Sequence, residues 1–187
     1  ITLVGVPVRF ESGVCGCIRL ANQGELLGKP ANTVKLSDLY IDIGAKDKEE
    51  AEKLVKIGDV AVFNTPTVEL AGGNVMTPYA DDLISCVVLL LAMEELKDKK
   101  CKNDLYFVFS TQEEVGLRGA TTAAYSIDPY MGIAVDVCST GDTPTTTVKM
   151  AVKVGEGPAI KIKDGSLICN PQAVAHMRRA AEKAGIK

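Results

Sequence analysis

The chain has 187 residues, of which 47% are hydrophobic and 24% are charged, and its formal net charge is −3. This length suits one domain or two small ones, and the slightly acidic charge provides no basic field to attract nucleic acid or anionic lipid. The longest apolar run, residues 83–93, is shorter than the roughly 20 residues that cross a bilayer, so we expect no membrane helix.

The first part of the chain is predicted to form short strands. Glycine and polar turns separate four β-rich runs, a pattern typical of a small barrel or sandwich. The runs are residues 2–10, 16–20, 33–44 and 58–64. One helix is predicted at residues 46–55, where acidic residues near the N-terminus suit the helix macrodipole.

The pattern changes near Gly72 and Gly73, after which helices and strands alternate as in an α/β sheet layer. Apolar residues at helical spacing predict a helix that begins at Asp81 and Asp82 and is closed by the basic run 97–100. The remaining expected elements are buried strands at residues 105–110 and 132–137, helices at 116–125 and 170–183, and a loop or edge strand at 143–147.

Six cysteines are scattered through apolar segments without a CxxC pair. We therefore expect reduced core thiols in a cytoplasmic protein. Cys15 and Cys17 could place two thiolates on one face of a strand, but two ligands do not make a zinc site.

Acidic residues collect around the predicted strands of the second part. Glu113 and Glu114 follow the first of these strands, Asp136 ends the second, and Asp81 and Asp82 begin the preceding helix. The carboxyl ends of strands in an open α/β sheet meet at one edge, where ligands bind. Carboxylates gathered there would repel one another unless cations neutralise them. The pattern predicts a site for two divalent metal ions with a free carboxylate as base, although each residue alone is more often a helix cap or a strand end.

The segment TQEEVGLRGA at residues 111–120, followed by IAVDV at residues 133–137, resembles the tetrahedral-aminopeptidase family of dinuclear metallo-aminopeptidases. The family comprises glutamyl, leucyl and deblocking enzymes, and some relatives carry an endoglucanase label. Three further stretches resemble the family in the same order, so the resemblance covers nearly the whole chain. They are DLYIDIGAKDKEEAEKL, IGDVAVF and GEGPAIKIKDGSLICNP.

The resemblance implies a role for each matching position. Asp81 would bridge two zinc or cobalt ions, Glu113 would be the general base that deprotonates water, and Glu114 and Asp136 would each be a ligand of one ion. Leu83 stands where the family usually has Arg, which leaves Asp82 as an alternative to Asp81.

Histidine is the larger departure from the family pattern. The family's site also uses two His ligands, and neither of their motifs is present. The single histidine, His176, matches no ligand position, and we expect it to be a surface or helix-packing residue.

The resemblance also implies a fold and an assembly. The fold would be α/β, with a partial three-layer metallopeptidase-like catalytic core and an inserted β-rich, barrel-like domain. Residues 1–74 would form most of the inserted lid or dimerisation domain, and residues 75–187 the central part of the catalytic domain. The chain would be a central fragment that binds metal weakly and is nearly inactive alone. Its partners would be peptide substrates and further copies of itself, with dimers assembling to a dodecamer.

Two alternatives remain beside the aminopeptidase. A glycoside hydrolase would use two carboxylates without metal, but 5% aromatic residues and no tryptophan provide few sugar platforms. A non-catalytic module would use the β-rich first part only to form a homo-oligomer. The preferred N-terminal residue and the choice among zinc, cobalt and manganese stay open.

Overall fold

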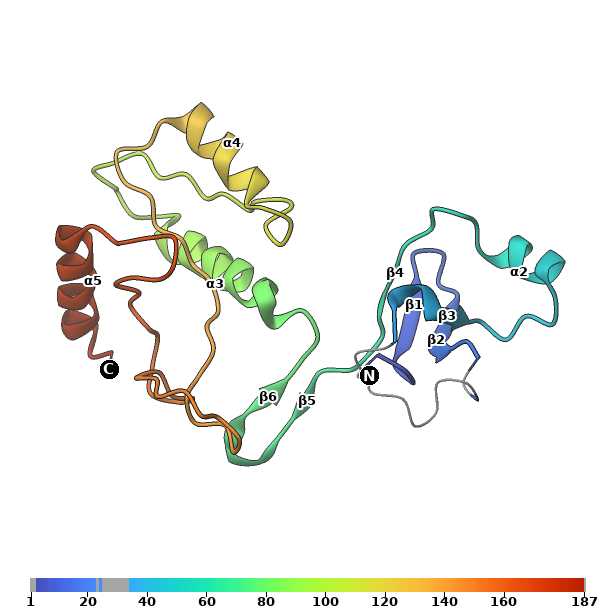
Figure 1. The fold of residues 1–187 in the computed structure, drawn as a ribbon. Coiled ribbons are helices and arrows are strands. Elements are labelled where there is room, and N and C mark those ends of the chain that lie inside the picture. Colours follow the sequence, from blue (N-terminus) through green and yellow to red (C-terminus); the bar gives the residue numbers. More distant parts are fainter. Residues whose placement is uncertain (1–2, 23, 25–33, 187) are drawn as a thin grey trace. The chain divides into compact units, whose positions relative to one another are not determined.

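The computed structural model describes residues 3–22, 24 and 34–186. It divides into two compact units, Ile1–Leu83 and Ile84–Lys187, and Figure 1 labels their elements. The domain boundary predicted between residues 74 and 75 stays a prediction.

An antiparallel sheet of four strands, in the order β3-β2-β1-β4, organises the first unit. Each strand overlaps one of the four β-rich runs, so these predicted strands are confirmed. They are β1 (Pro7–Phe10), β2 (Cys15–Leu20), β3 (Leu39–Asp42) and β4 (Ala61–Phe63). Thr2 and Thr33, which begin two of the runs, lie outside the described residues.

Two glycines allow this sheet to form. Gly13, with φ +90°, turns the chain between β1 and β2, a conformation that costs glycine little. At Gly16, a Cβ atom would lie 2.6 Å from the side chain of Ile41 and 2.8 Å from the carbonyl oxygen of Asp42. Glycine there allows β2 and β3 to pair closely.

The helix α2 (Lys48–Leu54) confirms the helix predicted at residues 46–55. It begins at Asp47, whose side chain accepts a hydrogen bond of 2.9 Å from the N–H of Glu50. This is the capping interaction that aspartate provides at a helix N-terminus.

Short elements complete the first unit. A 3-10 turn, η2 (Leu36–Asp38), leads into β3. The strands β5 (Val68–Glu69) and β6 (Val75–Met76) pair antiparallel around a second turn, η3 (Ala71–Gly73).

Three helices confirm the three predicted in the second part of the chain. They are α3 (Ala80–Leu96), α4 (Arg118–Ile127) and α5 (Pro171–Ala184). The side chain of Asn170 caps α5 by accepting from the N–H groups of Gln172 at 2.8 Å and Ala173 at 3.4 Å.

The strands predicted at residues 105–110 and 132–137 are wrong, because neither segment forms a strand or a helix. A buried strand requires neighbouring strands that accept and donate its backbone hydrogen bonds, and none of the described ladders includes these residues. Most of their apolar side chains are accordingly exposed, with Tyr106 at 65% and Ile133 at 60%. The described residues nevertheless combine helices with two antiparallel sheets, and this mixed content is consistent with the α/β class. Residues 143–147 form a loop, one of the two predicted states.

Few side chains of the described residues are buried. Val8 at the centre of β1 is the buried apolar side chain, 3% exposed, and Ser85 on α3 is the buried polar one. The six cysteines are free, as expected, but the prediction of core thiols is wrong. Three are exposed and three half-buried, because the apolar segments around them are not covered. Over the described ranges, no helix has the length and apolarity needed to cross a membrane.

Candidate active site

Asp81 and Asp82 lie at the N-terminal end of α3, as predicted. Their backbone is not yet helical, with φ/ψ of −87°/103° at Asp81 and −127°/47° at Asp82, and the peptide bond between them is cis. Asp81 is exposed and Asp82 is half-buried. Carboxylates at this end of a helix are favoured by the positive end of the macrodipole.

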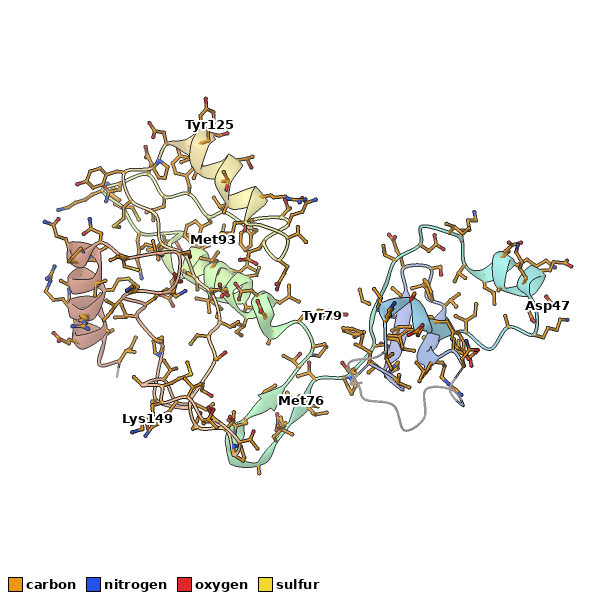
Figure 2. The ribbon with its side chains drawn as sticks, in the orientation of Figure 1. Asp47, Met76, Tyr79, Met93, Tyr125 and Lys149 are labelled. Atoms are coloured by element: carbon orange, nitrogen blue, oxygen red, sulfur yellow. The ribbon has the colours of Figure 1, made fainter. Side chains whose placement is uncertain are left out.

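Tyr79 anchors the segment that leads to these aspartates. Its hydroxyl accepts a hydrogen bond from the N–H of Phe63 in β4, and the two rings are stacked with centroids 6.2 Å apart. Figure 2 labels Tyr79. Its carbonyl oxygen accepts from the N–H of Leu83 at 3.1 Å. The sequence carried no signal for the contact between Tyr79 and Phe63, because the two residues lie 16 positions apart.

Glu113 and Glu114 lie in a short loop of residues 111–117, here called the acidic loop, which precedes α4. The carbonyl oxygen of Glu113 accepts from the N–H groups of Gly116 at 3.1 Å and Leu117 at 2.9 Å. Both glutamates are exposed. The loop therefore holds its own backbone in a closed turn while the two carboxylates lie at the surface.

Asp136 is exposed and receives a hydrogen bond of 2.7 Å from the N–H of Val137. The pKa of Lys161 is raised from its ordinary value, mainly by the hydrogen bond that its ammonium group donates to Asp164 and to a smaller extent by the charge of Asp136. The charges of Asp136 and Lys161 therefore interact. The sequence did not single out Lys161.

Another acidic residue of the second unit, Asp142, lies outside the predicted set. The hydroxyl of Thr140 and the N–H of Val154, the latter at 3.1 Å, hold its pKa below the ordinary value. These bonds fix the loop after residue 140, so we assign Asp142 a structural role.

The predicted ligands are divided between the two units of the chain, so the proposed metal centre stays a prediction. Asp81 belongs to the first unit, and Glu113, Glu114 and Asp136 belong to the second. Neither unit, over its described residues, brings three His, Cys, Asp or Glu side chains close enough together to hold a metal ion. In chemistry, however, the donors fit: carboxylate oxygens are ligands of zinc, cobalt and other divalent ions.

His176 lies in α5 and is exposed. This agrees with the expectation of a surface residue.

Among the predicted site residues, Glu113 and Glu114 are the two that lie in one loop.

The sequence pattern of the M42 glutamyl aminopeptidase family matches residues 11–187. A curated protein of Acetivibrio thermocellus is 46% identical over 183 residues, which cover 98% of this chain and 53% of that protein. The lysyl aminopeptidase of Pyrococcus furiosus is 36% identical over 170 residues, which cover 86% of this chain and 47% of that enzyme. The chain therefore spans about half the length of these curated relatives.

Solved structures give the same picture. The TET1 peptidase of Pyrococcus horikoshii, described as assembling into a tetrahedron or a large octahedral shell, superposes with a TM-score of 0.81 at 36% identity and covers 98% of this chain and 56% of its own. A Thermotoga maritima protein named endoglucanase superposes with a TM-score of 0.76 at 26% identity, covering 98% of this chain and 53% of its own.

Proposed function

The chain belongs to the M42 glutamyl aminopeptidase family, and from that premise we propose that it is part of a metal-dependent aminopeptidase that removes N-terminal residues from peptides. The observation that carries the proposal is the family match over residues 11–187, which includes all four predicted site residues. Metal dependence is general in this family, and the acidic donors of this chain suit it.

We assign the four residues the roles that the resemblance implies. Asp81, Glu114 and Asp136 would hold two divalent ions, zinc or cobalt, which supply positive charge that acidifies water and polarises a carbonyl group. Glu113 accepts a proton from the attacking water and donates it to the leaving amine. Glu113 is an exposed residue of the acidic loop.

The larger architecture is part of the same proposal. Residues 1–74 form an inserted β-rich, barrel-like lid or dimerisation domain, and residues 75–187 form the central part of a three-layer catalytic domain. The antiparallel sheet of the first unit supports the β-rich part of this assignment. We also propose a cytoplasmic location, which the six free cysteines support.

The protein assembles as a homo-oligomer in this proposal, with dimers forming a dodecamer. The support is the likeness to the Pyrococcus horikoshii peptidase and to a second solved structure described as a dodecamer, which is 36% identical with a TM-score of 0.78.

A glycoside hydrolase is the second candidate, favoured by the named Thermotoga maritima endoglucanase. Such an enzyme uses an acid and a base without metal and binds sugars on aromatic platforms. The chain has no tryptophan and 5% aromatic residues, so we rank this function below peptide hydrolysis.

Substitution of the proposed base tests the function. In the full-length natural polypeptide, we expect Glu113→Gln to lower kcat for release of an N-terminal residue by about 10²–10⁴-fold, the usual contribution of a general base. The matched control Glu182→Gln changes an exposed residue of α5 and leaves kcat unchanged. Native mass spectrometry checks that both variants keep the oligomeric state.

The result that contradicts the assignment is a Glu113→Gln variant with the kcat of the unsubstituted enzyme. A full-length protein that oligomerises but releases no N-terminal residue from any peptide would instead favour the non-catalytic module.

A further inference from the structure

The first residues of α4 bond to the acidic loop. The N–H of Gly119 donates to the carbonyl oxygen of Thr111 at 2.9 Å, and the N–H of Arg118 donates to the carbonyl oxygen of Gln112 at 3.3 Å. The first N–H groups of a helix have no acceptor within the helix, and α4 has no side-chain cap. The carbonyl groups of the loop therefore serve as the cap of α4.

Arg118 also holds the loop through its side chain. Its guanidinium Nη1 donates to the side-chain oxygen Oε1 of Gln112 at 3.1 Å. Gln112 immediately precedes Glu113, so one arginine fixes the neighbour of the proposed base by a backbone bond and a side-chain bond.

Gly119 allows the helix and the loop to approach this closely. A Cβ atom at this position would lie 2.4 Å from the nitrogen and 2.7 Å from the oxygen of Thr111, and 3.2 Å from the carbonyl carbon of Ser110. All three are backbone atoms, which cannot rotate away as a side chain can. Any larger residue at position 119 must therefore displace the start of the loop.

The loop also contains backbone conformations that most residues avoid. Gln112 has φ +54°, Leu117 has φ +58° and Gly116 has φ +120°. Non-glycine residues adopt such angles where the surrounding structure enforces them, and these sites are often functional.

We propose that Arg118 and Gly119 are positioning residues that hold the acidic loop so that the Glu113 carboxylate keeps its catalytic orientation. They act through Thr111 and Gln112 and not on the substrate. The proposal rests on the proposed function, in which Glu113 is the base.

Steady-state kinetics of the full-length natural polypeptide test the proposal. Arg118→Ala and Gly119→Ala are expected to lower kcat by about 10²-fold, the cost of a small misplacement of a catalytic group, while KM changes little. Arg118→Lys keeps a donor for Gln112 and is expected to retain most of the activity. Matched controls are Gly165→Ala, where a Cβ meets no atom within 4 Å, and Arg179→Ala on the exposed face of α5.

Two further measurements separate positioning from a general loss of structure. Because Arg118 acts through Gln112, the combined Gln112→Ala and Arg118→Ala variant should lose no more kcat than either single variant. Amide hydrogen exchange at Gly119 and Leu117 should be faster in Arg118→Ala than in the unsubstituted protein, a readout that needs no activity.

Unchanged kcat in both Arg118→Ala and Gly119→Ala, in an enzyme that is itself active, would overturn the proposal and leave the proposed function intact. An unsubstituted protein without aminopeptidase activity would end the proposed function instead. In that case amide hydrogen exchange tests whether Arg118 holds the acidic loop. An exchange rate at Gly119 that is unchanged in Arg118→Ala overturns this part of the proposal, and a faster rate supports it.

Discussion

At the scale of single residues, Asp164 organises the turn that follows Lys161. Its Oδ1 accepts from the N–H groups of Ser166 at 2.8 Å and Leu167 at 2.7 Å, and its Oδ2 accepts from the ammonium group of Lys161 at 2.9 Å. The hydrogen bond from Lys161, followed by the two backbone N–H groups, holds the pKa of Asp164 far below its usual range. The ionised carboxylate is therefore the form that stabilises the turn.

This lowered pKa predicts a pH-dependent stability. The ionised form contributes its full stabilisation above the unfolded pKa, about 3.9, and the contribution is lost as the pH falls through the lower folded pKa. We expect Asp164→Asn to lower Tm at neutral pH and the difference from the unsubstituted protein to shrink in strong acid. Thermal unfolding between about pH 2 and pH 7 measures both.

The control for this experiment is Asp104→Asn, which changes an exposed aspartate and should alter Tm little at any pH. A Tm difference for Asp164→Asn that stays constant over the whole pH range would contradict the account of the turn.

At the scale of elements, α5 depends on a local cap. Asn170 precedes Pro171, and its side chain satisfies the N–H groups of Gln172 and Ala173. Replacement of such a cap by alanine costs about 1 kcal/mol. We expect Asn170→Ala to lower the free energy of unfolding by about that amount in urea denaturation, whereas Asn170→Ser keeps most of the stability.

Gln172→Ala is the matched control, because the Gln172 side chain is exposed and makes no part of the cap. Equal urea midpoints for Asn170→Ala and the unsubstituted protein would show that the cap does not stabilise α5.

Helices were predictable from this sequence because their signals are local. Asp47 and the Asn170-Pro171 pair lie beside the helices that they begin. The apolar runs at 105–110 and 132–137 predicted strands, but a strand also needs a partner elsewhere in the chain, and the described residues supply none. The residues within a run cannot show whether such a partner strand is present.

The sequence predicted candidate residues for the site, which stay a prediction, but it did not predict the contacts that support them. Glu113 and Glu114 were found from the motif at residues 111–120, which also contains Arg118 and Gly119. The contacts that Arg118 and Gly119 make with the acidic loop are seen only in hydrogen bonds and backbone distances. The interaction between the charges of Lys161 and Asp136 likewise links two segments that are far apart in the sequence, so the sequence did not predict it.

At the scale of the whole molecule, many large apolar side chains of the described residues are exposed. Six apolar side chains of α3 are each about half exposed, although helices of folded domains usually bury such residues. They are Leu83, Ile84, Val87, Val88, Leu90 and Leu91. Since the chain also spans about half the length of its curated relatives, activity should be measured on the full-length natural polypeptide.

Chelation of that polypeptide tests the central claim most directly. The assay measures release of the N-terminal residue from a peptide with a free amino terminus and from the same peptide after acetylation, before and after removal of metal. We predict that only the free peptide is cleaved, that chelation abolishes cleavage, and that zinc or cobalt restores it. Cleavage that continues undiminished after metal analysis has confirmed complete removal, or hydrolysis of cellulose in place of peptide, would contradict the account.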